Sequence, residues 1–291
     1  MPTSITIKPS RMRLAGWREI HAGAGVALDP GSREAVERGS ATVAAILARD
    51  EAVYGINTGF GKLAQTRIRN EDVATLQRNL VLSHAAGVGP PLPRAIVRLA
   101  IALKIASLAR GHSGVRLELI EALLALPRHD IVPVIPSQGS VGASGALAPL
   151  AHLSAALIGE GDVIFRGVHM AASDALRWIG LDQVVLGPKE GLALLNGTQV
   201  STALALAGLF AMERVFAAAL VAGAMTLDAI EGSDTPYDER IHALRGHAGQ
   251  RRVAAALRGL AVGSAIRESH RGCAKVQDPY SLRCQPQVMG A

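Results

Sequence analysis

The stretch from Gly139 to Leu153, GSVGASGALAPLAHL, constrains the fold of this chain most strongly. A proline-rich approach, VPVIPSQ, leads into it, and from about Leu147 the run can continue as a helix. The residues Ala143-Ser144-Gly145 at the junction carry no bulky side chain, and a glycine permits backbone geometry that other residues avoid. The stretch lacks the lysine of a phosphate-binding loop, and its glycine spacing fits neither the dinucleotide fingerprint nor the nucleophile elbow. The sequence therefore predicts a loop that folds back on itself before a helix.

Composition and apolar patterns predict a helical protein. Hydrophobic residues make up 49% of the 291 residues and aromatic residues only 3%, which favours helices over a β-sandwich. An almost wholly apolar helix is expected from about Asn196 past Leu227, and such a helix belongs in a large bundle or an oligomer interface. DVIFRGVHM predicts one small hairpin. The opening ITIKP can form a short strand, and Ser32 is expected to cap a helix. Further helices are predicted at about residues 17–21, 32–48, 72–86, 93–110, 115–126, 147–158, 173–179, 238–245 and 249–260. The predicted fold is all-α, with long helices, a loop-rich N-terminal region and a small β-hairpin.

Charge and cysteine content exclude several classes of protein. The net charge is +6, but the basic residues are scattered and few aromatic residues are present to stack on bases, so no nucleic-acid partner is expected. The two cysteines, Cys273 and Cys284, form neither a disulfide framework nor a metal-ligand pattern. The N-terminus lacks the apolar segment of a signal peptide. Two uncharged windows, 131–159 and 191–212, contain prolines or polar residues and predict buried interior rather than a membrane span. We therefore expect a cytoplasmic protein.

Three further segments accompany the loop, namely YGINTGFG at 54–61, GLALLNGTQ at 191–199 and QDPYSLRCQPQ at 277–287. Together with GSVGASGALAPLAH, and in this order, they resemble the signature segments of the aromatic amino-acid ammonia-lyases, a family that depends on 4-methylidene-imidazol-5-one (MIO). The similarity covers essentially the whole chain, is closest to the histidine ammonia-lyases, and corresponds to their N-terminal portion only. It implies a long-helix bundle of the ammonia-lyase/fumarase-like type and a homotetramer whose active sites draw on more than one subunit. Residues 1–110 would then form an N-terminal region with Tyr54 and His84, and residues 111–291 would contain the MIO loop and the start of the central bundle.

The resemblance implies which residues carry the chemistry. Ala143-Ser144-Gly145 would cyclise and lose water to give MIO, with the Gly145 nitrogen attacking the Ala143 carbonyl and Ser144 becoming a methylidene. This electrophile would replace a soluble cofactor, and no metal is expected. Tyr54 matches the family's catalytic tyrosine, whose phenolate can abstract a β-hydrogen. Asn196 matches the asparagine that hydrogen-bonds the MIO carbonyl or the substrate amine, and Tyr280 matches a second active-site tyrosine.

Three further positions are implied to bind an amino-acid substrate. Arg283 offers a guanidinium fork that suits a carboxylate, and Gln277 lies in the same segment. His84, in LVLSHAAGVG, matches the position that selects the aromatic ring, and a histidine there can hydrogen-bond an imidazole or a phenol but finds no polar partner on a phenyl ring. Taken alone, a lone histidine, a lone arginine or a glycine-serine loop is also compatible with a purely structural role.

The implied activity is the non-oxidative deamination of L-histidine to trans-urocanate and ammonia in histidine catabolism. A tyrosine or phenylalanine ammonia-lyase or an aminomutase on the same scaffold is the nearest alternative. A different class, an inactive truncated pseudoenzyme that retains only assembly surfaces, is favoured by two departures from the family pattern. The family's usual segment is Ala-Ser-Gly-Asp, and in this chain Ala146 stands where the aspartate is expected. In addition, the C-terminal part that supplies further pocket residues in the family does not follow Ala291.

Overall fold

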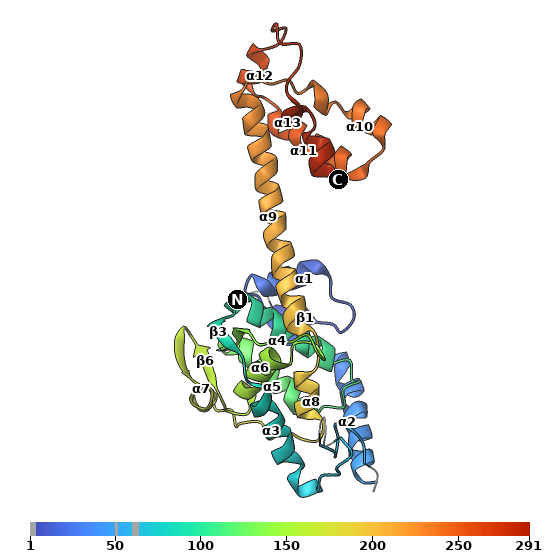
Figure 1. Cartoon of the computed structure of the whole chain (residues 1–291), viewed down its shortest axis with the longest axis vertical. Coiled ribbons are helices and arrows are strands. Elements are labelled where there is room, and N and C mark those ends of the chain that lie inside the picture. The colour runs from blue at the N-terminus through green and yellow to red at the C-terminus, as the bar shows by residue number, and fades with distance from the viewer. Residues whose placement is uncertain (1–3, 50–51, 60–63) are drawn as a thin grey trace. The chain divides into compact units, whose positions relative to one another are not determined.

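The computed structural model describes residues 4–49, 52–59 and 64–291 (Figure 1). The chain divides into two compact units, Met1–Gly208 and Leu209–Ala291, so the boundary falls inside the long helix α9 (Gln199–Ala229). This division differs from the one expected at residue 110. The helices on either side of that position, α4 (Arg94–Leu108) and α5 (Leu117–Arg128), pack against each other within the first unit.

Helices dominate the first unit, as the composition predicts. Besides α4 and α5 it contains α1 (Leu14–His21), α2 (Arg33–Leu47), α3 (Val73–His84), α6 (Leu147–Leu157), α7 (Ala172–Trp178) and α8 (Glu190–Leu195). Short 3-10 turns at Pro30–Ser32 and Asn70–Asp72 precede α2 and α3. The predicted helices are confirmed to within a few residues, whereas α8 was not predicted. The capping role of Ser32 is wrong, because Ser32 already has helical dihedral angles (φ −78, ψ −20) and its side chain makes no capping hydrogen bond.

The core of the first unit lies around α4, α5 and α6. Helix α4 is buried over most of its circumference and packs against α1 and α5. Helix α6, which begins directly after the glycine-rich loop, packs against α3 and α8, and Leu80, Ala151 and Leu195 from these three helices form one buried cluster. The three helices lie together in Figure 1. Apolar burial therefore fixes the helices that carry His84, the loop and Asn196 relative to one another.

Three small sheets complete the first unit. Strand β1 (Ser4–Ile7) pairs in parallel with β2 (Gly25–Leu28), and β3 (Val88–Pro91) pairs antiparallel with β5 (Pro136–Gln138). The predicted hairpin is confirmed as β6 (Asp162–Phe165) and β7 (Val168–Ala171), with Arg166 and Gly167 both at positive φ in the turn. Strand β4 (Ile131–Pro133) adds to this hairpin through β6. Strand β1 agrees with the short strand expected at ITIKP. Strands β2 to β5 were not predicted, because they are only three or four residues long and too short for an alternating pattern to reveal them.

The second unit is a small helical cluster. It contains the end of α9, a 3-10 turn at Thr235–Tyr237 and five short helices, α10 (Glu239–Arg245), α11 (Ala248–Ala261), α12 (Ala265–Ser269), α13 (Tyr280–Arg283) and α14 (Gln285–Gly290). Tyr237 is fully buried in its core with Leu227, Val253 and Leu257. The Tyr237 hydroxyl donates to the Leu282 carbonyl at 2.9 Å, and burial, assisted by the charge of Asp278, raises the pKa of Tyr237 to about 12.

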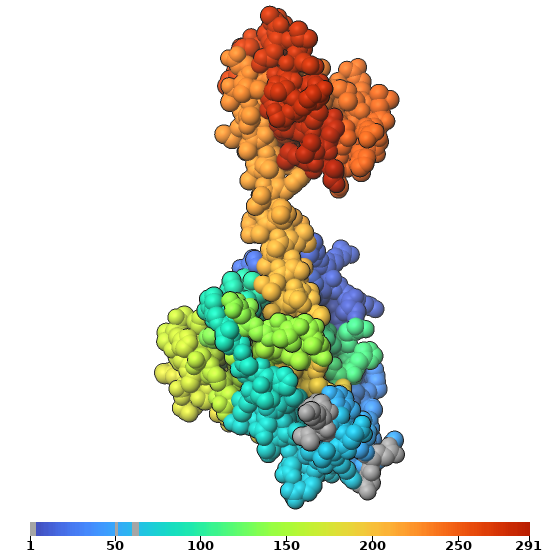
Figure 2. All heavy atoms as spheres, in the orientation of Figure 1, coloured from blue at the N-terminus to red at the C-terminus, as the bar shows by residue number. Residues whose placement is uncertain are grey.

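Many large apolar side chains of helix α9 are exposed in the single chain, and the atoms of this helix are the yellow to orange ones in Figure 2. Within the described residues it is the one helix long and apolar enough to cross a membrane by length and composition alone, and only 6% of its apolar window is buried. The expectation that residues 191–212 form buried interior holds for α8 and for Val200, Ala203 and Phe210, but it is wrong for the rest of the window. Residues 212–219 of α9 are exposed on every side of the helix. Large apolar side chains are exposed along α9 at Leu204, Leu209, Met212, Val215, Phe216, Val221 and Met225.

Candidate active site

The loop between β5 and α6 folds back as the sequence predicts. Ser144 has φ of +53, in the left-handed region that few residues other than glycine adopt, and Gly145 follows with φ of +94. The residues from Val141 to Ser144 are exposed, while Ala146 at the start of α6 is 3% exposed. The tripeptide Ala143-Ser144-Gly145 therefore lies at the surface of this chain, on a turn whose far end is fixed in the core.

A short backbone ladder ties this turn to the Asn196-Gly197 segment. The Gly197 N–H donates to the Ser144 carbonyl at 3.3 Å, and the Ala146 N–H donates to the Gly197 carbonyl at 2.9 Å. The approach is so close that a Cβ on Gly145 would lie 2.0 Å from the Gly197 carbonyl oxygen. Glycine is required at position 145 for this reason, beyond its positive φ.

The backbone nitrogen of Gly145 is left available by this ladder. Hydrogen bonds engage the carbonyls of Ser144 and Gly145 and the N–H of Ala146, while within the described residues the Gly145 N–H has no acceptor. A nitrogen that is to attack the carbonyl two residues back has to be free of a competing hydrogen bond.

Asn196 lies directly after α8, next to the loop. Its side-chain Nδ2 donates to the Leu192 carbonyl at 2.9 Å, which fixes the orientation of the amide group. The Oδ1 oxygen and the second N–H of the amide remain for other partners. Sequence resemblance predicted Asn196 beside the loop, and the structure brings the two together.

Helix α8 is fixed at its first residue by a buried carboxylate. Glu190 is 1% exposed and accepts hydrogen bonds from the Arg116 backbone N–H (2.9 Å), the Arg116 guanidinium (2.7 and 3.1 Å) and the Gly187 N–H (2.7 Å). The hydrogen bond to Glu190, the largest cause, raises the pKa of Arg116. Four hydrogen bonds to one carboxylate compensate the cost of burying its charge.

The other end of α8 is held by a buried lysine. Lys104, from the middle of α4, donates from Nζ to the carbonyls of Ala193 (2.9 Å) and Asn196 (2.8 Å). Burial lowers the pKa of Lys104 from 10.5 to about 7. Sequence reasoning missed both Glu190 and Lys104.

His84 is the last residue of α3, and the backbone carbonyl of Leu80 determines which nitrogen of its ring can accept a hydrogen bond. Nδ1 lies 2.8 Å from the Leu80 carbonyl oxygen. Because a carbonyl only accepts, Nδ1 must carry the proton, and in the neutral ring Nε2 is then an acceptor. After α3, the Gly87 N–H donates to Nε2 of His152 in α6, and burial lowers the pKa of His152. This bond links the His84 region to the helix that follows the loop.

Tyr54 lies in a turn that packs against α8. Its ring is 56% exposed, whereas Gly55 to Gly59 are buried. A Cβ on Gly55 would lie 2.3 Å from Leu192 Cδ2, which shows how closely the turn approaches the helix that carries Asn196. Phe60 and Gly61, which end the YGINTGFG segment, lie outside the described residues.

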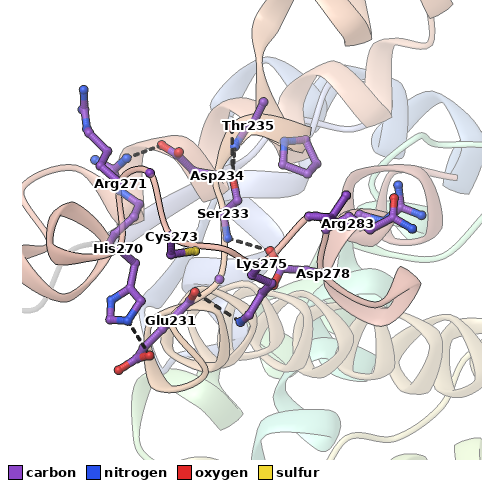
Figure 3. Close-up of a pocket in the computed structure, with 16 residues that line it drawn as sticks. Glu231, Ser233, Asp234, Thr235, His270, Arg271, Cys273, Lys275, Asp278 and Arg283 are labelled. Atoms are coloured by element: carbon purple, nitrogen blue, oxygen red, sulfur yellow. Dashed lines mark hydrogen bonds and ion pairs between the residues drawn. The ribbon is translucent and has the colours of Figure 1, made fainter.

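The remaining predicted residues belong to the second unit. Arg283 stacks on the ring of Tyr280 at 4.5 Å, and Tyr280 is 72% exposed. Gln277 and Arg283 line a pocket of about 530 Å³, shown in Figure 3, where Asp278 accepts from the Ser233 N–H and His270 pairs with Glu231. The Nε of Arg283 is buried without a hydrogen-bond partner in the described part of the chain. Over the same residues, no cluster of three or more histidine, cysteine or acidic side chains has a metal-binding arrangement.

Comparison with known proteins matches this arrangement to one family. The family model described as aromatic amino acid lyase matches residues 12–291. A histidine ammonia-lyase from Paracidovorax citrulli (strain AAC00-1) is 59% identical over 292 residues, which cover 100% of this chain and 57% of the relative. The chain thus spans a little more than half the length of the curated relatives that it matches.

Solved structures agree on the fold. The histidine ammonia-lyase from Trypanosoma cruzi superimposes with a TM-score of 0.86 at 32% identity, covering 99% of this chain and 53% of that one. A tyrosine aminomutase from Streptomyces globisporus gives a TM-score of 0.86 at 31% identity over 100% of this chain and 58% of its own. The predicted bundle of the ammonia-lyase type is therefore confirmed.

Proposed function

The chain belongs to the aromatic amino acid lyase family, and on that premise we propose that it carries the ring-forming half of a histidine ammonia-lyase. The reaction would remove ammonia from L-histidine without oxidation and leave trans-urocanate. One observation carries the proposal: backbone hydrogen bonds pair the Ser144 carbonyl and the Ala146 N–H with Gly197 and, within the described residues, leave the Gly145 nitrogen available. An ordinary surface turn before a helix has no need of this arrangement.

The residues of the turn fit the MIO group. Ala143 is small, Ser144 has a hydroxyl that can leave, and Gly145 offers a nitrogen without a side chain beside it. When formed, MIO would supply an electrophile that activates the substrate for loss of its amine. Asn196 would orient the group through its free amide oxygen or N–H, because its Nδ2 is already fixed on Leu192.

The other side chains would bind the substrate and move its proton. Tyr54, exposed beside α8, would accept the β-hydrogen. The substrate carboxylate would bind Arg283, whose unpartnered Nε and planar fork suit a carboxylate, with Gln277 beside it in the same pocket. Tyr280 would contribute through its stacking on Arg283.

His84 favours histidine as the substrate. With Nδ1 donating to Leu80, its neutral ring offers Nε2 as an acceptor for an N–H donor such as an imidazole. A phenol could use the same acceptor, so tyrosine is the second candidate, whereas phenylalanine offers no hydrogen. The 58–60% identity to three curated histidine ammonia-lyases favours the first.

We further propose that the protein is cytoplasmic and works as a homotetramer. The exposed apolar side chains of α9 support an interface, because so many large apolar side chains exposed along one helix are rare on a monomer. Active sites shared between subunits would also explain why the predicted residues lie in both units of the chain.

Intact mass and turnover test the proposal. Ring formation removes two waters, so the purified chain should be about 36 Da lighter than its sequence mass. Ser144→Ala removes the leaving hydroxyl and should abolish the deficit, while the matched Ser137→Ala, at an exposed position on β5 before the loop, should retain it. Absorbance assays with L-histidine, L-tyrosine and L-phenylalanine then identify the substrate. A full sequence mass, or a cinnamate from tyrosine with no urocanate from histidine, would contradict the proposal.

The alternative of a non-catalytic chain has one specific observation in its favour. Ala146, at the N-cap of α6, has no side chain that could hold the helix entrance, and no capping bond is present there. An unmodified mass that Ala146→Asp does not change would support this alternative.

A further inference from the structure

Lys104 is a buried cation whose only acceptors in the described residues are backbone carbonyls. It is 1% exposed, and within that part of the chain its Nζ contacts no carboxylate, only the Ala193 and Asn196 oxygens. A buried ammonium is costly, so a lysine among the buried apolar side chains of α4 needs a reason. A leucine or methionine at this position would avoid that cost.

The Asn196 carbonyl belongs to the same peptide group as the Gly197 N–H. A trans peptide points its C=O and its N–H in opposite directions. On one side the oxygen accepts from Lys104 at 2.8 Å, and on the other the nitrogen donates to the Ser144 carbonyl at 3.3 Å. Lys104, one peptide group and Ser144 thus form a continuous chain of hydrogen bonds. A cationic donor at its start strengthens the N–H donor at its end.

We propose that Lys104 is a positioning residue for ring formation: through the Asn196–Gly197 peptide it orients and polarises the N–H that binds the Ser144 carbonyl. This inference rests on the proposed function. It adds to that function a residue on α4 that lies outside all four signature segments.

The chemical reason lies in the amide that reacts. The Ser144 carbonyl is the acyl group of the Gly145 nitrogen, so a hydrogen bond to its oxygen stabilises negative charge as that nitrogen loses its proton. The Gly145 nitrogen then bonds to the Ala143 carbonyl carbon. The Ala143 oxygen takes one hydrogen from the Gly145 nitrogen and one from the Ser144 nitrogen, and it leaves as the first water. The Ser144 hydroxyl and α-hydrogen form the second water, so both lost waters are accounted for.

A purely structural role of Lys104 is the competing interpretation, since the same bonds hold the end of α8. Arg116→Met is the matched control, because it breaks the Glu190 pair at the opposite end of α8 and leaves the Asn196–Gly197 peptide untouched. Lys104→Met removes the donors at similar length, Lys104→Gln keeps a short neutral donor, and Lys104→Arg keeps the charge. Circular dichroism confirms that each variant is folded before its modification is compared.

The time course of the mass deficit after refolding decides between the two roles. We expect the wild type and Arg116→Met to lose two waters at similar rates. Lys104→Met should be slower by about tenfold or more, which corresponds to about 1.4 kcal/mol in the barrier, and Lys104→Arg should recover part of the rate. If Lys104→Met does not fold, Lys104→Gln should show the slowing instead. Equal rates in folded Lys104 variants and wild type would overturn the inference alone. An unmodified wild type would overturn the proposed function, and the inference with it.

Discussion

Replacing Ala146 by aspartate should stabilise the first unit by capping α6. Ala146 is the N-cap residue of this helix and makes no side-chain capping bond. The first helical hydrogen bond runs from the Leu150 N–H to the Ala146 carbonyl at 3.0 Å, so the amides before Leu150 lack helical partners. A carboxylate at position 146 would supply the missing acceptor.

The size of the effect follows from how many amides the carboxylate can reach. An N-cap side chain normally bonds the second or third helical N–H, but the third residue of α6 is Pro149, which has none. Only the Ala148 N–H remains, so one capping bond of about 1 kcal/mol is gained, with about 0.3–1 kcal/mol from the helix dipole. Position 146 is 3% exposed, so desolvation of the carboxylate opposes this gain. We expect a net increase of about 1 kcal/mol, or about 2–4 °C in Tm for a unit of this size.

Thermal unfolding followed by circular dichroism measures this change. Ala146→Asn, which can cap without a charge, should give a smaller increase, and Ala148→Asp, which adds the same charge in the first turn but cannot cap, should give only the dipole contribution. The reasoning is refuted if Ala146→Asp lowers Tm, or if Ala148→Asp raises it equally. Ala146→Asp should also complete the loss of two waters sooner than the wild type, because a fixed helix entrance holds the loop in its turn.

Three further predictions concern the site and its supports. Gly145→Ala should abolish the mass deficit and destabilise the first unit, because the added Cβ would meet the Gly197 oxygen at 2.0 Å; retention of the deficit would contradict the backbone ladder between the two segments. His84→Phe should lower kcat/KM for histidine by about 10- to 100-fold, since the free Nε2 acceptor is lost, whereas His84→Gln should lose less; an equal loss in both variants would exclude the acceptor role. For Lys104, with a folded pKa of about 7 against 10.5, the unfolded chain binds more protons between these values, so the free energy of unfolding should rise with pH across this window and fall as pH drops towards 7. The slope should be smaller in Lys104→Gln by the contribution of Lys104, as chemical denaturation at several pH values would reveal, while Lys189, whose pKa burial also lowers, keeps its own contribution.

The helices could be predicted from sequence because their apolar residues are numerous and local. Burial confirms the patterns of α3 to α6, whose ends were placed within a few residues. Helix α8 was missed because it is only six residues long and is held by distant partners rather than by its own propensity. Its first residue depends on Arg116 and its last carbonyls on Lys104, and such non-local contacts leave no periodic pattern.

The candidate site was predicted only where short segments resemble a family. His84, Asn196 and the Ser144 turn were proposed as site residues in this way, and packing among α3, α6 and α8 explains why they lie on neighbouring elements. The sequence pattern around Lys104 also indicated a buried functional group, although no role was predicted for this residue. It is the single charged residue on a helical stripe that includes Ile101 and Leu108, both buried. A lone lysine on a buried stripe predicts a specific acceptor inside the protein.

The composition of α9 does not distinguish a helix that faces lipid from one that other helices cover, but the positions of its charged residues do. A lipid-facing helix and a helix covered by other helices both expose large apolar side chains in an isolated chain. The centre of the 31-residue α9, however, holds Glu213 and Arg214, both exposed. At the middle of a bilayer each such charge would cost about 2.5–3.5 kcal/mol, whereas in a helical assembly the two can lie at a rim or pair with a neighbour. The position of these two residues therefore favours helices of other protein subunits, rather than lipid, as the cover of α9.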